Sequence, residues 1–153
     1  VDRYGSLLGQ LSADPAGAPA PGTPARDRWD EVVLPGSALS GELLDRIHRR
    51  AVEDRVVIDA DDDGVSFRHV PVGLDATGPT EIRFRWCGWS PGIGRSLDSG
   101  DVVDDAVAHT TGTGSLVRVG DAWRLAALDQ HDLQLLPPGS PDPCPTAPTG
   151  DRP

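Results

Sequence analysis

Three carboxylates close together, Asp101, Asp104 and Asp105, are the clearest candidates for acid–base chemistry in this chain. A carboxylate in an apolar pocket can act as a general acid or base, because burial shifts its pKa toward neutrality. Strand alternation places Asp104 on the same face as Val102 and Ala106, so this carboxylate is the candidate to point inward. Carboxylates in turns are usually solvated, and we expect most of this group to lie at the surface.

Two histidines, His69 and His109, lie on different predicted strands and form, with one of these carboxylates, a candidate metal-ligand set. Ligands without close spacing are a weak signal for zinc. The two cysteines, Cys87 and Cys144, stand in no CxxC motif and in no Cys/His cluster. The sequence therefore predicts no metal and no cofactor.

The same two cysteines form an even pair, and we predict a disulfide between Cys87 and Cys144. Cys144 lies in a Pro-rich tail that has little else to hold it in place. Alternation puts Cys87 on the strand face opposite Phe84 and Trp86, where a tail leaving the last strand at Leu136 can reach it. The alternative is one buried thiol and one free thiol in the tail.

Aromatic side chains are the main candidates for lining a pocket. The candidate pocket residues are Trp86, Trp89, Phe67 and Asp104. Aromatic residues at alternating strand positions more often belong to the core, and that interpretation stays open beside the first. Arg83 and Arg85 have the chemistry to bind a carboxylate ligand, but cross-strand pairing with acidic neighbours is the simpler expectation.

Helices and strands must position these groups, and the predicted helices lie in the first part of the chain. Helices are predicted over residues 3–12 and 41–54, with Ser40 as the N-cap of the second. Between them, the Pro/Ala/Gly-rich residues 13–26 predict a loop, and residues 28–34 predict a short helical turn or a strand.

From Arg55 onward the apolar period changes from 3.6 to 2, which predicts a meander of about five or six antiparallel strands. Gly112 and Gly114 are interpreted as part of a hairpin turn. Trp123 follows a tight turn at the start of an apolar strand, and we expect it to be buried. The chain is therefore predicted to be a single α+β domain over residues 1–136, followed by an extended tail over residues 137–153.

The composition excludes several classes of partner. The chain of 153 residues has 24 acidic and 14 basic residues, which gives a net charge of −10. A negative surface repels nucleic-acid phosphates and anionic lipid headgroups. We therefore expect no nucleic-acid partner and no membrane contact by this segment itself, with an upstream anchor left open.

The segment from about Gly100 to Leu136 contains paired last strands around Trp123. Its hairpin places Leu116, Arg118 and Val119 before the turn and Trp123, Arg124 and Leu125 after it. In this pattern the chain resembles the NTF2-like (SnoaL-like, cystatin-like cone) superfamily, and the tail is similar to that of actinobacterial exported or anchored versions. The resemblance implies N-terminal helices packed into a strongly curved antiparallel sheet, in a superfamily that hosts enzymes, binders and inert scaffolds.

An enzyme of this fold works with a carboxylate in an apolar pocket and a phenolic or protonated acid donor opposite. The only tyrosine, Tyr4, is near the N-terminus, so the donor is expected to be missing. We therefore expect a non-enzymatic accessory or protein-interaction domain, extracytoplasmic because its disulfide needs an oxidising space. The alternative is a small-molecule-binding domain or weak enzyme that uses the mouth of the cone, and an open cavity with an inward Asp104 would favour it. The partner is an unknown protein or small molecule, and a homodimer is left open.

Overall fold

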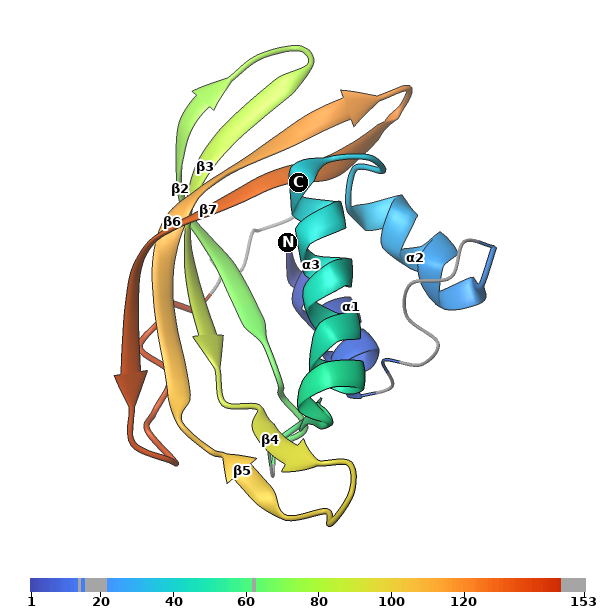
Figure 1. Ribbon diagram of the computed structural model, residues 1–153. Helices are drawn as coiled ribbons and strands as arrows, with labels where there is room; N and C mark the ends of the chain where they lie inside the picture. Colours follow the sequence, from blue (N-terminus) through green and yellow to red (C-terminus); the bar gives the residue numbers. More distant parts are fainter. Residues whose placement is uncertain (14, 16–21, 62, 147–153) are drawn as a thin grey trace.

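A computed structural model describes residues 1–13, 15, 22–61 and 63–146 (Figure 1). Within this part of the chain, every helix precedes the first strand, which confirms the predicted α+β class. The helical elements are α1 (Asp2–Ala13), α2 (Pro24–Val32), α3 (Ala38–Arg49) and the short π-helical turn η2 (Arg50–Asp54).

The third helix begins earlier than predicted. Ser37 is its N-cap, and the Ser37 hydroxyl accepts a hydrogen bond from the backbone N–H of Ser40 at 3.2 Å. Ser40 itself lies inside α3 and is buried, and its hydroxyl accepts a hydrogen bond from Trp29 Nε1 at 2.9 Å. Both serines have the chemistry of an N-cap, so the sequence alone does not distinguish them. The prediction of Ser40 was wrong because packing places its hydroxyl against the buried indole of Trp29.

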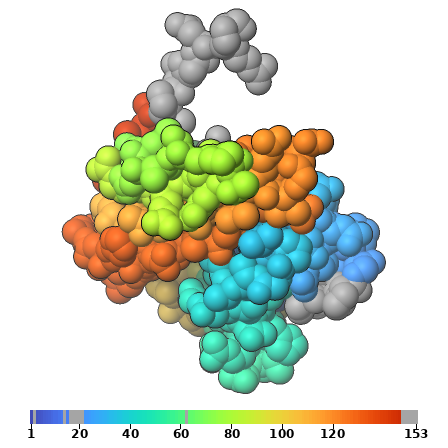
Figure 2. All heavy atoms as spheres, turned by 90° about the horizontal axis from the view of Figure 1, so that it is seen from above, coloured from blue at the N-terminus to red at the C-terminus, as the bar shows by residue number. Residues whose placement is uncertain are grey.

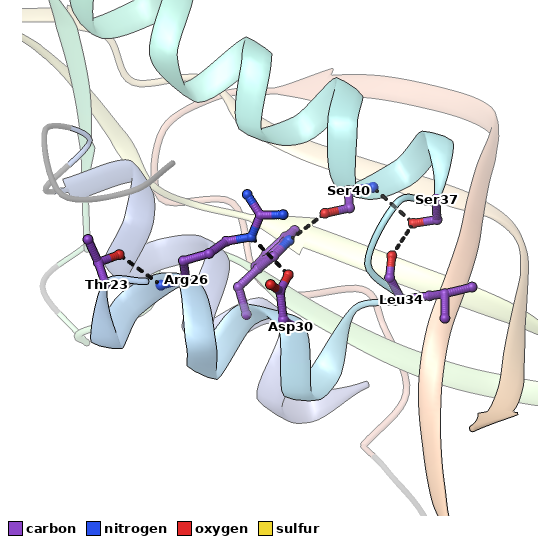
Figure 3. Close-up of polar contacts among 7 residues, drawn as sticks. Thr23, Arg26, Asp30, Leu34, Ser37 and Ser40 are labelled. Carbon is purple, nitrogen blue, oxygen red and sulfur yellow. Dashed lines mark hydrogen bonds and ion pairs between the residues drawn. The ribbon is translucent and has the colours of Figure 1, made fainter. Parts of the chain in front are cut away.

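Polar contacts stabilise helix α2 and the start of helix α3 (Figure 3). Thr23 caps α2 by accepting a hydrogen bond from the backbone N–H of Arg26 at 3.3 Å. Arg26 also pairs with Asp30 one turn later, at 2.9 Å. The chain then leaves the helix in extended form, and Val33 forms a bridge to Leu125 in the last strand. The segment predicted as helix or strand is thus a helix that ends in a single strand-like contact.

The strands form two antiparallel sheets. The larger sheet has the order β2-β3-β6-β7, and the smaller has the order β1-β4-β5. The larger sheet curves around α1 and α3 (Figure 1), and its β6–β7 hairpin lies beside the start of α3 when the molecule is seen from above (Figure 2). The strand bounds are β1 (Val56–Asp59), β2 (Arg68–Thr77), β3 (Glu81–Ser90), β4 (Ile93–Ser96), β5 (Val102–Asp104), β6 (Val107–Val119) and β7 (Ala122–Leu136).

Glycines inside β6 allow neighbouring backbone and aromatic rings to approach closely. Gly112 and Gly114, predicted in a hairpin turn, lie within one continuous strand, so that prediction was wrong. A Cβ on Gly112 would lie 1.9 Å from the carbonyl oxygen of Asp129, and one on Gly114 would lie 2.7 Å from the Phe84 ring. These glycines are therefore required by packing rather than by a turn.

The main core lies between the concave face of the larger sheet and the three helices. Phe84 and Trp86 point into it from β3, as the predicted alternation requires. Leu125 contributes from β7 and is only 1% exposed. Trp29 of α2, which is 0% exposed, fills the space between the helices and the sheet and contacts the ring of Tyr4, with centroids 5.8 Å apart.

Trp123 does not belong to this core. Its residue is 37% exposed, so the expectation that it is buried was wrong. Trp123 shares its strand face with Leu125, but the extended chain after α2 covers only Leu125, whose carbonyl accepts a hydrogen bond from the Leu34 N–H at 2.8 Å. The helical layer ends before it reaches Trp123.

The convex face of the larger sheet carries a second, smaller core. Cys87 and Cys144 form a disulfide there, which confirms the predicted pair, and they pack with Val70 and Trp89. An ion pair between Arg68 and Asp142 holds the same stretch of tail against β2. The tail is thus attached to the sheet by a covalent bond and an ion pair.

Candidate functional site

A cavity of about 400 Å³ lies between the concave face of the larger sheet and helices α1 and α3. Apolar and polar side chains from both layers contribute about equally to its wall. Leu133 and Leu135, near the end of β7, line the cavity and are exposed, as are Arg46 and Arg50 on the helical side, so the cavity is open to solvent. We call this space the inner cavity.

Three of the four predicted pocket residues meet in the inner cavity. Trp86, Phe67 and Asp104 all line it, from β3, from the chain just before β2 and from the end of β5. Trp89 lies instead on the convex side, where it lines a separate groove beside the tail. The structure therefore brings together two aromatic groups and one carboxylate.

Asp104 is an exposed carboxylate at the edge of the inner cavity. Its Oδ1 atom accepts a hydrogen bond from the backbone N–H of Ala106 at 3.1 Å, which fixes the turn between β5 and β6. Its neighbour Asp105 lines the groove on the convex side. The neighbouring carboxylates of Asp104 and Asp105 thus lie on opposite sides of the sheet.

Tyr4 also lines the inner cavity, although the sequence interpretation had set it aside. It is 3% exposed, and α1 carries it to the cavity by the same spacing that buries Leu7, Leu8 and Leu11. Burial raises the pKa of the Tyr4 phenol, an effect that the nearby positive charge of Arg46 opposes. The phenol therefore stays protonated and can donate a hydrogen bond into the cavity. The expectation that a donor is missing was wrong.

His69 joins Tyr4 and Trp86 in an aromatic wall of the cavity. The ring of His69 lies edge-on to Tyr4, with centroids 4.9 Å apart, and 5.4 Å from the ring of Trp86. Its Nδ1 atom is buried and has no hydrogen-bond partner within the described residues. Burial, and then the charge of the N-terminal amino group, lower the pKa of His69 to about 4. The imidazole is therefore neutral at pH 7.

This depressed pKa predicts a stability change on acidification. Between pH 6.5 and 4 the unfolded chain binds a proton at His69 that the folded protein does not, so the free energy of unfolding falls as the pH falls. The shift corresponds to a loss of about 3 kcal/mol from pH 7 to pH 4. In His69→Phe this contribution should disappear from urea unfolding measured across that range. His48→Phe, on an exposed face of α3, is the matched control and should keep the wild-type pH dependence. Equal slopes in all three proteins would contradict the assignment.

Charged side chains from α3 and η2 lie beside the apolar wall. Arg46 and Arg50 line the inner cavity, as does Glu42 one turn earlier. The same two arginines also flank a narrow adjoining slot of about 120 Å³. The residues of the slot other than these arginines are mostly apolar and comprise Leu8, Ser12, Leu43, Ile47, Val56, Ile58 and Phe67.

The closest cluster of metal-ligand atoms among the described residues lies on the convex face. It consists of Cys87, Cys144 and His109, whose ligand atoms all lie within 4.8 Å of one another. The His109 Nε2 atom is 3.4 Å from the Cys87 sulfur. Both sulfur atoms are bonded to each other in the disulfide, so the oxidised protein offers one imidazole rather than three ligands.

Across the described residues, each helix is too short or too polar to span a bilayer. Comparison of the chain with protein-family models, with curated proteins and with solved structures gives no match. A functional proposal therefore depends on the geometry and chemistry of the inner cavity.

Proposed function

We propose that this domain binds a small organic molecule in the inner cavity. The observation that carries the proposal is the cavity itself, about 400 Å³ between the sheet and two helices. Ligand sites in proteins have volumes of about 300–1,000 Å³ and combine an apolar wall with a few convergent polar groups. Here Trp86 and Phe67 supply apolar wall, and Tyr4 and His69 supply polar atoms.

The arrangement favours binding over catalysis. Tyr4 provides the buried hydrogen-bond donor of an acid–base pair, but the carboxylate of Asp104 is exposed and occupied with its own backbone. A general base of this type works when burial raises its pKa. The neutral His69 ring is enclosed by two aromatic rings, which suits contact with an apolar ligand.

The wider setting of this proposal is an extracytoplasmic NTF2-like domain. Helices followed by a curved antiparallel sheet support the superfamily, and a disulfide that persists only in an oxidising space supports the location. An interaction module without a ligand has no need of an open cavity. For that reason the small-molecule alternative is preferred here to the accessory or protein-interaction role.

The test is binding of the neutral dye N-phenyl-1-naphthylamine, whose fluorescence rises in apolar surroundings. We expect saturable binding by the wild type. Ala108→Phe places a ring on the cavity floor and should weaken binding at least about tenfold, because it fills space that the dye needs. Ala76→Phe makes the same change at an exposed site on β2 and should bind as the wild type does. Thermal unfolding checks that both variants fold. Absence of saturable binding, or equal binding by both variants, would overturn the proposal.

A further inference from the structure

Two arginines at the inner cavity have no acidic partner, in a protein with an excess of acidic residues. Among the described residues, neither Arg46 nor Arg50 has a carboxylate within 4.0 Å, although Glu42 and Asp104 line the same cavity. By contrast, arginines elsewhere form ion pairs, namely Arg3, Arg26, Arg55, Arg68, Arg83, Arg85, Arg95 and Arg118. Arg28, Arg49 and Arg124 also have no ion pair among the described residues, but they do not line the cavity, so Arg46 and Arg50 are the unpaired charges that a ligand there would meet.

The helix geometry directs both guanidinium groups to one place. Arg46 and Arg50 are four residues apart, so they lie on the same side of the helix as it passes from α3 into η2. The backbone N–H of Arg55 bonds to the carbonyl group of Arg50, five residues earlier, which is the π-helical bond of η2. Such turns occur often at functional sites.

The slot beside these arginines is mostly apolar. Arg46 and Arg50 line both the inner cavity and the narrow slot, so they stand where the two hollows meet. Leu43, Ile58 and Phe67 are also common to both hollows. A ligand that occupies both hollows meets the apolar side chains of the slot beside two cationic groups.

We infer that the ligand is an amphipathic organic anion, with its carboxylate or similar head bound by Arg46 and Arg50 and its apolar body in the slot and inner cavity. This inference rests on the proposed function, since it names the chemical class of the ligand for the same site. Guanidinium groups form charge-assisted, often bidentate hydrogen bonds with carboxylates. A neutral amide of the same shape replaces an ionic contact with a weaker one, and the site should therefore distinguish the two.

The experiment compares octanoate with octanamide, which have the same chain and differ in the charge of the head. Each compound displaces N-phenyl-1-naphthylamine from the protein at pH 7 and low salt. We expect octanoate to displace the dye at a concentration about tenfold lower than octanamide, and we expect the preference to shrink as salt rises. In the double variant Arg46→Gln/Arg50→Gln the preference should disappear, and the affinity of that variant for the dye is measured separately so that the two displacements are compared at equal dye occupancy.

The matched control is Arg28→Gln/Arg49→Gln, which removes two positive charges from exposed positions that do not line the cavity. It should keep the preference for octanoate, which separates a local contact from the net charge of the protein. Octylammonium is the probe of opposite charge, and stronger displacement by it would overturn the inference in favour of Glu42 and Asp104. Equal displacement by octanoate and octanamide would overturn it as well, while leaving the proposed function in place. Failure of the dye to bind at all would instead overturn the proposed function.

Discussion

Trp29→Ala is expected to lower the free energy of unfolding by about 3–5 kcal/mol, the usual cost of removing a fully buried indole from a core. Trp29 is 0% exposed and joins α2, α1 and α3 through its contacts with Tyr4 and Ser40. Truncation leaves a cavity between the helices and also leaves the Ser40 hydroxyl without its partner. Urea unfolding followed by circular dichroism measures the loss.

Trp123→Ala is the matched control for this experiment. It removes the same side chain from a residue that is 37% exposed at the end of a hairpin, so the expected loss is below about 1 kcal/mol. A third variant, Ser40→Ala, isolates the hydrogen bond and should cost about 1–3 kcal/mol, because the buried Trp29 N–H then lacks an acceptor. Equal losses in Trp29→Ala and Trp123→Ala would contradict the packing described for the helical layer.

Removal of the disulfide is the second change with a large expected effect. The bond joins residues separated by 57 positions, and the entropy of closing such a loop in the unfolded chain corresponds to about 4 kcal/mol. We therefore expect reduction of the wild type, or the double variant Cys87→Ala/Cys144→Ala, to lower the free energy of unfolding by about this amount. Chemical unfolding with and without a phosphine reductant measures it.

The double variant also serves as the control, because reductant should not change its unfolding curve. Release of the tail should in addition expose Arg68, which Asp142 and the Pro145 carbonyl now hold, and so increase its cleavage by trypsin. An unfolding curve of the wild type that does not respond to reductant would show that the bond contributes nothing to stability.

Periodicity accounts for the elements that could be predicted from the sequence. The apolar spacing of α1 and the alternation along β3 depend on neighbours in the chain, and both were confirmed. Trp123 shows what periodicity leaves out. Alternation correctly groups it with Leu125 on one face, but the extent of the helical layer over that face is a tertiary property.

The candidate site was predicted only in part, for a similar reason. Trp86 and Phe67 were found because they lie in recognisable strand signals, whereas Tyr4 was set aside for its position near the N-terminus. The curved sheet brings α1 next to β2, so distance along the chain says little about distance in space. The side of the sheet on which Trp89 lies could have been predicted from the sequence. Residues 86 and 89 are an odd number of positions apart, so their side chains point to opposite faces of a strand.

The covalent bond between β3 and the tail also determines how the protein responds to mechanical force. It closes a loop that contains β4, β5, β6 and β7 and excludes all three helices. Tension applied to the two chain ends cannot extend the residues inside the loop, which shortens the fully extended chain by about 200 Å. Under load the helices would extend while the strands of the loop stay unloaded. The tension passes through the helices and through β1, β2 and the part of β3 before Cys87, so the wall of the inner cavity that carries Arg46 and Arg50 is loaded together with one half of the larger sheet.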